Sequence, residues 1–173
     1  MLKKIAILGP ESTGKSELTE ELAAFYNTVY ATEFARNYIA GLGRPYNEND
    51  LLHIAKKQLE STEYSSRKAK DYLFSDTELI VIKIWSEFKY KSVHPWIINE
   101  IKKQDFDLYL LTDIDLEWEF DPLREHPNKR ERLLNLYTKE LDKRKLPYIK
   151  ISGQGKERTL NAIKAIDDFF KAE

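Results

Sequence analysis

Residues 9–16 read Gly9-Pro10-Glu11-Ser12-Thr13-Gly14-Lys15-Ser16, a complete match to the pattern G-x-x-x-x-G-K-[ST] of phosphate-binding loops. The match also stands in the setting that this pattern requires. A short apolar run from Lys3 to Leu8 predicts a strand before the loop. Apolar residues at helical spacing predict a helix that begins near Gly14. The chain therefore opens with a strand, a phosphate-binding loop and a helix.

Each residue type in this loop has a chemical reason. Glycines let main-chain N–H groups turn inward around phosphate oxygens, and the start of a helix adds the positive end of its dipole. Lys15 brings a point charge to the outer phosphates, and the Ser16 hydroxyl can bind a Mg²⁺ that bridges two of them. A plain glycine-rich turn would leave this lysine and serine unexplained. We expect Mg²⁺ with ATP, or alternatively GTP, as the ligand, bound by Gly9, Glu11, Ser12, Thr13, Gly14, Lys15 and Ser16.

The rest of the chain alternates short apolar runs with longer amphipathic segments, the pattern of parallel strands joined by helices. Strands are expected at 3–8, 28–32, 72–76, 108–111 and 147–151. Apolar stripes predict helices with Leu18, Leu22 and Phe25, with Phe34 and Tyr38 up to Gly41, from the cap Asn47 to about Lys70, with Ile80 to Phe88, at 95–101, with Leu133 to Leu141, and with Leu160 to Phe170. We expect an α/β fold of the P-loop NTPase type, in three layers, with a parallel sheet of about five strands between helices.

Composition limits the classes of function. The 173 residues, 42% of them apolar, suffice for the core of one domain that spans 1–173. The 28 Lys and Arg residues balance 29 Asp and Glu residues, which argues against nucleic acid or an anionic membrane as partner. The lack of cysteine excludes disulfide scaffolds, thiolate zinc sites and cysteine nucleophiles. Without a signal peptide or membrane span near its start, we expect a cytoplasmic protein, and the sequence leaves a homo-oligomer open.

Three charged residues follow predicted strands. Asp76 ends a buried strand at the sheet edge where nucleotide-binding folds collect ligands, so it is a candidate for Mg²⁺ or its water shell. Alternatively, it caps the next helix together with Thr77 and Glu78. Glu33 and Arg36 lie three residues apart, hence on one helical face, where Glu33 can accept a hydroxyl proton and Arg36 can hold a ribose oxygen or a phosphate. An ordinary surface ion pair explains the same spacing.

The segment from Ile114 to Asn128 lacks a sustained period of 2 or 3.6, which favours a mobile loop such as a lid. Arg124 lies inside this segment and is the first candidate to close over the γ-phosphate and neutralise charge in the transition state. Arg130 follows the segment as a second candidate. Lys129 and Arg132 fit a solvated helix face.

Two tryptophans are candidates to stack on a ligand ring. Trp118 lies in the irregular segment, and Trp85 lies on the predicted helix near 80–88. The helical spacing of Trp85 with Ile84 and Phe88 favours core packing for Trp85.

The loop at 9–16, Glu33-x-x-Arg36 with Tyr38, Asp76-Thr77, Trp118 and Asp121-Pro122-Leu123-Arg124 occur in an order that resembles the ribosylnicotinamide kinase domain of the NadR family. The resemblance covers nearly the whole chain. It implies transfer of the γ-phosphate of ATP to the 5′-hydroxyl of nicotinamide riboside, which gives nicotinamide mononucleotide in a salvage route to NAD. It further implies that the loop binds ATP, Asp76 serves Mg²⁺, Glu33 and Arg36 face the nucleoside, and Arg124 belongs to the lid.

The sequence departs from that family in two places. Members that hold nicotinamide can carry a tryptophan directly before the glutamate, where a flat ring would stack on the pyridinium, but Thr32 stands here. Full-length members carry a nucleotidyltransferase domain upstream, and some carry a DNA-binding domain. We expect neither here, because the chain starts at the strand of the phosphate loop.

Other functions also fit a phosphate-binding loop in a chain of this size. One is a kinase of another nucleoside or of a vitamin alcohol. Another is a nucleotide-dependent regulatory ATPase whose segment 114–128 moves on hydrolysis and contacts a protein partner. For a kinase, either Glu33 or Asp76 guides the attacking hydroxyl.

Overall fold

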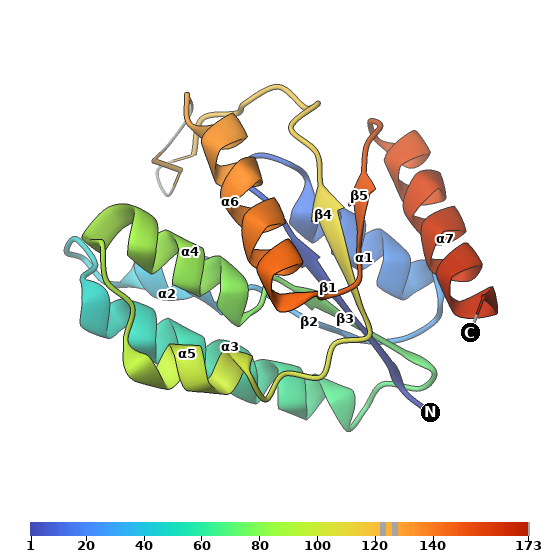
Figure 1. Ribbon diagram of the computed structural model, residues 1–173, viewed down its shortest axis with the longest axis horizontal. Coiled ribbons are helices and arrows are strands. Elements are labelled where there is room, and N and C mark those ends of the chain that lie inside the picture. The colour runs from blue at the N-terminus through green and yellow to red at the C-terminus, as the bar shows by residue number, and fades with distance from the viewer. Residues whose placement is uncertain (122–123, 126–127, 173) are drawn as a thin grey trace.

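A parallel sheet forms the centre of the computed structural model, which describes residues 1–121, 124–125 and 128–172 (Figure 1). Its strands are β1 (Lys3–Leu8), β2 (Tyr30–Ala31), β3 (Tyr72–Asp76), β4 (Leu108–Thr112) and β5 (Tyr148–Ile151). They lie in the order β2-β3-β1-β4-β5, and every neighbouring pair is parallel. The strand that leads into the phosphate loop is therefore central, and its Ile7 lies opposite Asp76 of β3. The expected fold with five parallel strands between helices is confirmed.

Helices cover both faces of this sheet (Figure 1). One face carries α1 (Lys15–Phe25) and α7 (Lys156–Lys171). The other carries α2 (Phe34–Gly41), α3 (Glu48–Ser66), α4 (Leu79–Tyr90), α5 (Pro95–Ile101) and α6 (Arg130–Arg144). Because side chains alternate along a strand, Ile5 and Ile7 of β1 pack in the first layer while Ala6 and Leu8 pack in the second. Burial on both faces explains why the strands read as continuous apolar runs.

Some element boundaries differ from the sequence-based expectation. The extended stretch expected at 28–32 is a strand only at Tyr30–Ala31, and the helix expected to reach Lys70 ends at Ser66. The expected cap of α3 is confirmed, since Asn47 accepts hydrogen bonds from two N–H groups of its first turn. Glu78 caps α4, where it accepts from the N–H of Ile80 at 2.9 Å, so Asp76 does not serve as that cap.

Two residues expected on buried helix faces are exposed. Phe25 is 60% exposed and Leu160 is 64% exposed. Phe25 is the last residue of α1, at the margin of the face that buries Leu18 and Leu22. The buried face of α7 runs through Arg158 and Ala162, and Leu160 lies about 200° around the helix from both. Apolar spacing predicted the helices correctly but placed these two side chains wrongly.

The segment expected to form a lid, 114–128, is irregular where the structure describes it. Pro122 and Leu123, which belong to the family-like motif, lie outside the described residues. Across the described ranges, none of the helices combines the length and the apolar character needed to cross a membrane.

Candidate active site

The phosphate loop leaves the end of β1 through a backbone approach that only glycine allows. Gly9 has φ +149°, and a Cβ there would lie 2.3 Å from Oγ1 of Thr112 on β4. The hydroxyls of Thr13 and Thr112 lie 2.7 Å apart, and Thr13 Oγ1 also donates to the Pro10 carbonyl at 2.7 Å. These buried contacts tie the loop to the sheet edge. Gly9 and Thr13 thus shape the loop, while its amides remain available for an anion.

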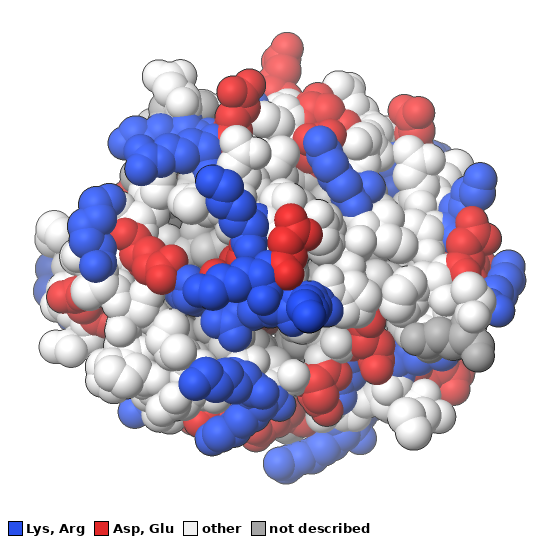
Figure 2. Space-filling view, viewed as in Figure 1, with Lys and Arg blue, Asp and Glu red and all other residues white. Residues whose placement is uncertain are grey.

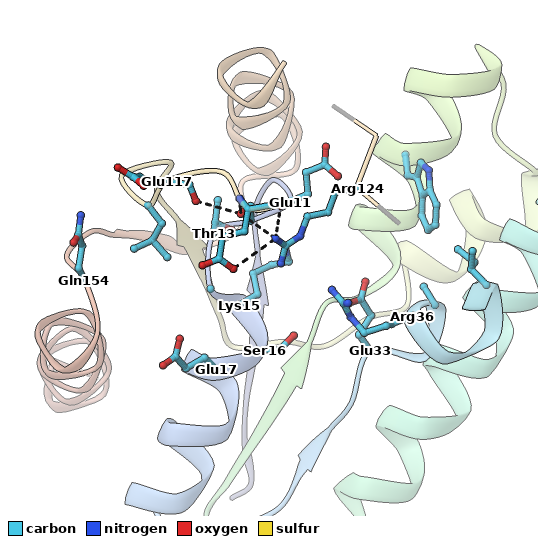
Figure 3. A pocket seen from close by; sticks show the side chains of 17 residues that line it. Glu11, Thr13, Lys15, Ser16, Glu17, Glu33, Arg36, Glu117, Arg124 and Gln154 are labelled. Carbon is cyan, nitrogen blue, oxygen red and sulfur yellow. Dashed lines mark hydrogen bonds and ion pairs between the residues drawn. The ribbon is translucent and has the colours of Figure 1, made fainter. Parts of the chain in front are cut away.

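Lys15 occupies the centre of the site (Figure 3). Its Nζ donates to the carbonyl of Pro10 at 2.8 Å. Burial lowers the pKa of Lys15, and the carboxylates of Glu33, Asp76 and Glu11 oppose that shift. A cation surrounded by acidic groups and turned toward the loop is placed to receive an anionic ligand.

Ser16 and Asp76 meet beside Lys15. Asp76 is buried, and burial raises its pKa. A hydrogen bond with the Ser16 hydroxyl and the positive charges of Lys15 and Arg36 oppose this shift. Its Oδ1 is buried and finds no hydrogen-bond partner among the described residues. A hydroxyl beside a buried, partly unsatisfied carboxylate suits Mg²⁺, which takes few protein ligands and completes its shell with water and phosphate oxygens. The residues present therefore fit the expected metal.

Glu33 and Arg36 lie at the start of α2, on the opposite side of the cavity from Gln154 (Figure 3). Burial raises the pKa of Glu33, and the Lys15 charge is the main opposing influence. Arg36 is paired with Asp121 at 2.6 Å, which connects α2 to the segment 114–128. The ion pair that the structure shows for Arg36 is thus with Asp121, and the charge of Glu33 also acts on Arg36.

Residues of the segment 114–128 and of the start of α6 bind the phosphate loop, mainly at Ser12. This residue has φ +56°, and its hydroxyl accepts from the N–H of Glu119 at 2.9 Å and from Nη1 of Arg124 at 3.2 Å. Arg130 donates to the Ser12 carbonyl at 3.2 Å. The N–H of Glu125 donates to Glu11 at 2.9 Å. The structure thus brings Arg124 and Arg130 to the loop, whereas Lys129 and Arg132 lie over the ring of Phe88.

The loop, Glu33, Arg36 and Arg124 line one cavity of about 630 Å³. A smaller cavity of about 130 Å³ adjoins it, shares Lys15 and Glu33, and has a wall formed by Val81, Ile84, Trp85, Phe88, Leu133 and Tyr137. Trp85 lines both cavities, and its Nε1 donates to the Tyr46 hydroxyl at 2.8 Å. Trp85 packs against the hydrophobic core, as its helical spacing predicted, and it is only partly buried, so it also lines both cavities.

Positive and negative side chains are mixed on one face of the molecule. Figure 2 shows Lys and Arg side chains interspersed with Asp and Glu side chains over the face that it displays. Across the described residues, no three His, Asp or Glu side chains gather into a metal-binding cluster. The metal expected at Ser16 and Asp76 needs no such cluster, since phosphate oxygens supply further ligands.

Known proteins resemble this chain in sequence and in fold. The trifunctional NAD biosynthesis/regulator protein NadR of Escherichia coli (strain K12) is 26% identical over 156 residues, which are 87% of this chain and 38% of that relative. A crystal structure of NadR in complex with NR has a TM-score of 0.85 and 20% identity, and the match covers 96% of this chain and 51% of that chain. The structure of thymidylate kinase from Ehrlichia chaffeensis has a TM-score of 0.68 and 14% identity, and the match covers 95% and 98% of the two chains.

These matches confirm the resemblance to NadR that the motifs suggested, and they show a kinase-like fold. The chain spans about two fifths of the length of the curated relatives it matches. A family model described as an AAA domain matches residues 4–158, which is most of the chain. The protein therefore belongs to the AAA domain family.

Proposed function

We propose that residues 1–173 act as one kinase domain, which uses ATP with Mg²⁺ to phosphorylate the 5′-hydroxyl of nicotinamide riboside or a closely similar nucleoside. One observation carries the proposal: the phosphate loop and an acceptor-side carboxylate, Glu33, line the same cavity. A site built only to hydrolyse ATP would not need an adjoining aromatic cavity beside that carboxylate. The relative NadR is a NAD biosynthesis protein whose structure has been solved in complex with NR, which supports the same substrate class.

The donor half of the reaction follows from the loop. Main-chain amides of residues 9–16 would surround the phosphates, and Lys15 would leave the Pro10 carbonyl to reach the outer ones. Mg²⁺ held at Ser16 and Asp76 would neutralise charge on two phosphates. Arg124, already beside Ser12, would act on the charge that develops at the transferred group.

The acceptor half follows from the smaller cavity. Trp85, Phe88 and Tyr137 give it an aromatic wall, and its volume of about 130 Å³ suits a single ring. A pyridinium ring is cationic, so aromatic faces and the nearby carboxylate of Glu33 both favour it. Trp85 would thereby provide stacking that the exposed Thr32 cannot. In this arrangement Glu33 binds the 5′-hydroxyl and accepts its proton, and the raised pKa of Glu33 makes it a stronger base than an ordinary glutamate.

An acceptor panel tests the proposal. The protein is incubated with MgATP and either nicotinamide riboside, thymidine, deoxyadenosine or no acceptor, and ADP and phosphorylated products are measured by mass spectrometry. We expect the riboside to be converted most efficiently, with one ADP formed per product. Faster conversion of a deoxynucleoside would indicate a kinase of another nucleoside. ADP formation at the same rate without an acceptor would indicate the regulatory ATPase instead.

A further inference from the structure

Arg158 is a buried cation that is not among the residues lining the two cavities of the proposed site. It is the third residue of α7 and is only 3% exposed. Its Nε donates to the Gly153 carbonyl at 2.8 Å, its Nη2 pairs with Asp115, and its Nη1 donates to the Thr13 carbonyl. One guanidinium thus joins the turn before α7, the residues after β4 and the phosphate loop.

The contact with Thr13 fixes the direction of a loop amide. In a trans peptide, the carbonyl of one residue and the N–H of the next point in opposite directions. Because Arg158 holds the Thr13 carbonyl on its own side, the N–H of Gly14 points to the other side. Gly14 lines the main cavity, and none of the backbone hydrogen bonds between described residues uses its N–H. Among the described residues this N–H thus has no backbone partner, and it can donate to a ligand.

Gly14 is a position where the peptide orientation needs support. Its φ of +70° lies in the left-handed region, and it precedes the first residue of α1 without a side-chain cap. Consecutive amides in such a conformation form a concave site for an anion. A cation bonded to the carbonyl also polarises the peptide, which makes its N–H a stronger donor.

Arg158 is itself held in place by its neighbours. The Asp115 carboxylate that pairs with it also accepts from the N–H of Gly153 at 2.6 Å. A Cβ at Gly153, which has φ +107°, would lie 3.1 Å from the backbone N of Arg158. The turn thus approaches α7 closely and presents the guanidinium to the loop.

We propose that Arg158 is a positioning residue for the donor nucleotide: it keeps the Thr13–Gly14 peptide oriented so that the Gly14 N–H donates to a phosphate. The inference rests on the proposed binding of ATP by the loop. It concerns the donor alone, because Glu33 and Trp85 line the acceptor end of the site. Loss of Arg158 should therefore weaken nucleotide binding without weakening acceptor binding.

Four variants test this role. Arg158→Met removes the contact with Thr13, and Arg158→Lys keeps the charge without the fork of donors. Asp115→Asn weakens the ion pair but leaves an acceptor for Arg158, so the contact with Thr13 remains. Arg144→Met, on α6, removes an equal charge from a pair with Glu140 and serves as the control. For each protein, we would measure the Kd for MgAMP-PNP, both KM values, the Tm and the NMR shift of the Gly14 amide.

We expect Arg158→Met to raise the Kd for MgAMP-PNP and the KM for ATP by about tenfold or more, since a phosphate hydrogen bond is lost. The acceptor KM should stay within about twofold, and Arg158→Lys should rescue binding in part. In the parent protein the Gly14 amide should move downfield on adding MgAMP-PNP, and in Arg158→Met it should not. Asp115→Asn should lower the Tm about as much as Arg158→Met does, yet it should keep the affinity for the nucleotide. Arg144→Met should change neither the KM for ATP nor the KM for the acceptor.

Other results would overturn the inference. Parent-like nucleotide affinity in Arg158→Met would show that the peptide needs no such support. Equal loss of affinity in Asp115→Asn would assign Arg158 a purely structural role. If Arg158→Met does not fold, an unchanged KM for ATP in Arg158→Lys decides against the proposal. No binding of MgAMP-PNP by the parent protein would instead overturn the proposed function itself.

Discussion

Two carboxylates, the half-buried Glu33 and the buried Asp76, lie near Lys15 but in different surroundings. Burial raises the pKa of both. Asp76 is engaged by the Ser16 hydroxyl at the end of β3, whereas Glu33 starts α2 and lines the aromatic cavity. The sequence left open which of the two carboxylates guides the attacking hydroxyl. Their positions favour Asp76 for Mg²⁺ and Glu33 for the acceptor hydroxyl, and we propose this division of roles.

The pH dependence of turnover tests this assignment of Glu33. A general base must be ionised, so kcat/KM for the acceptor should rise with pH as Glu33 loses its proton. Because burial raises the pKa of Glu33, this rise should lie at higher pH than for an ordinary glutamate. Glu33→Gln should lower kcat by about 10²-fold or more and remove the rise. Glu17→Gln is the control, because Glu17 is an exposed carboxylate that lines the same cavity. If kcat/KM of Glu33→Gln still rose with pH as in the parent protein, the assignment would be refuted.

A tryptophan exchange tests the acceptor cavity. Trp85→Leu should raise the acceptor KM by about tenfold, because stacking on a cationic ring is lost, while the KM for ATP stays unchanged. Trp96→Leu is the matched control, since Trp96 lies on α5, outside the residues that line either cavity. Steady-state kinetics with both substrates varied would separate the two KM values. An effect on the KM for ATP alone would contradict this role for Trp85.

At the scale of elements, the segment 114–128 connects the two halves of the site. Arg124 and Glu125 contact the phosphate loop, while Asp121 pairs with Arg36 on α2. Tyr46 and Lys89 bind the Glu125 carboxylate on the acceptor side. The mobility of this segment stays a prediction. If it moves as a lid, these are the contacts that opening would break or preserve.

Arg124 offers a kinetic test of that segment. Arg124→Met should lower kcat by about 10²-fold or more, because charge at the transferred group loses its partner, with little change in Tm. Arg132→Met removes the same charge from the nearby helix face and should leave kcat unchanged. Single-turnover measurements at saturating ATP would report the chemical step. Equal effects of the two substitutions would argue for a general charge effect instead.

The start of α3 offers a stability test. Asp50 belongs to the capping box with Asn47 and pairs with Arg44 at 2.7 Å, and this arginine is the main cause of its lowered pKa. A carboxylate with a lowered pKa stabilises the fold above its unfolded-state pKa, and the contribution is lost as pH falls through its folded pKa. Asp50→Asn should therefore lower the free energy of unfolding by about 1 kcal/mol or more at neutral pH. It should also make the protein lose less stability as the pH falls. Denaturant unfolding at several pH values measures the free energy of unfolding, and Asp168→Asn, at an exposed carboxylate, is the control. If the free energy of unfolding fell equally steeply with decreasing pH in Asp50→Asn and in the parent protein, the prediction would be contradicted.

The sequence predicted elements better than it predicted partners. The phosphate-loop pattern and the apolar runs located the sheet, the helices and the loop, because these features are local. The partner of Arg36, the cavity face of Trp85 and the buried position of Arg158 depend on segments that are distant in sequence. No periodic signal marks such contacts. The same limit explains why Phe25 and Leu160 were expected inside and lie outside.

At the scale of the whole molecule, the central position of β1 organises the site. The strand is buried between the two helical layers, and its loop emerges at the sheet edge where β3 contributes Asp76 and β4 contributes Thr112. The acceptor cavity then opens toward the layer that contains α2 and α4, while α7 supports the loop from the other layer through Arg158. Under the proposed function, the acceptor end of the site thus lies toward one helical layer, while the other layer supports the phosphate loop.

Titration of the protein with AMP-PNP in the presence of Mg²⁺, followed by calorimetry, tests this account most directly. We predict saturable binding of one nucleotide per chain, and a loss of affinity of about tenfold or more in Lys15→Ala with the fold retained, since only the charge at the outer phosphates is removed. The absence of measurable binding to the parent protein would contradict the account, as would equal affinity in the Lys15→Ala variant.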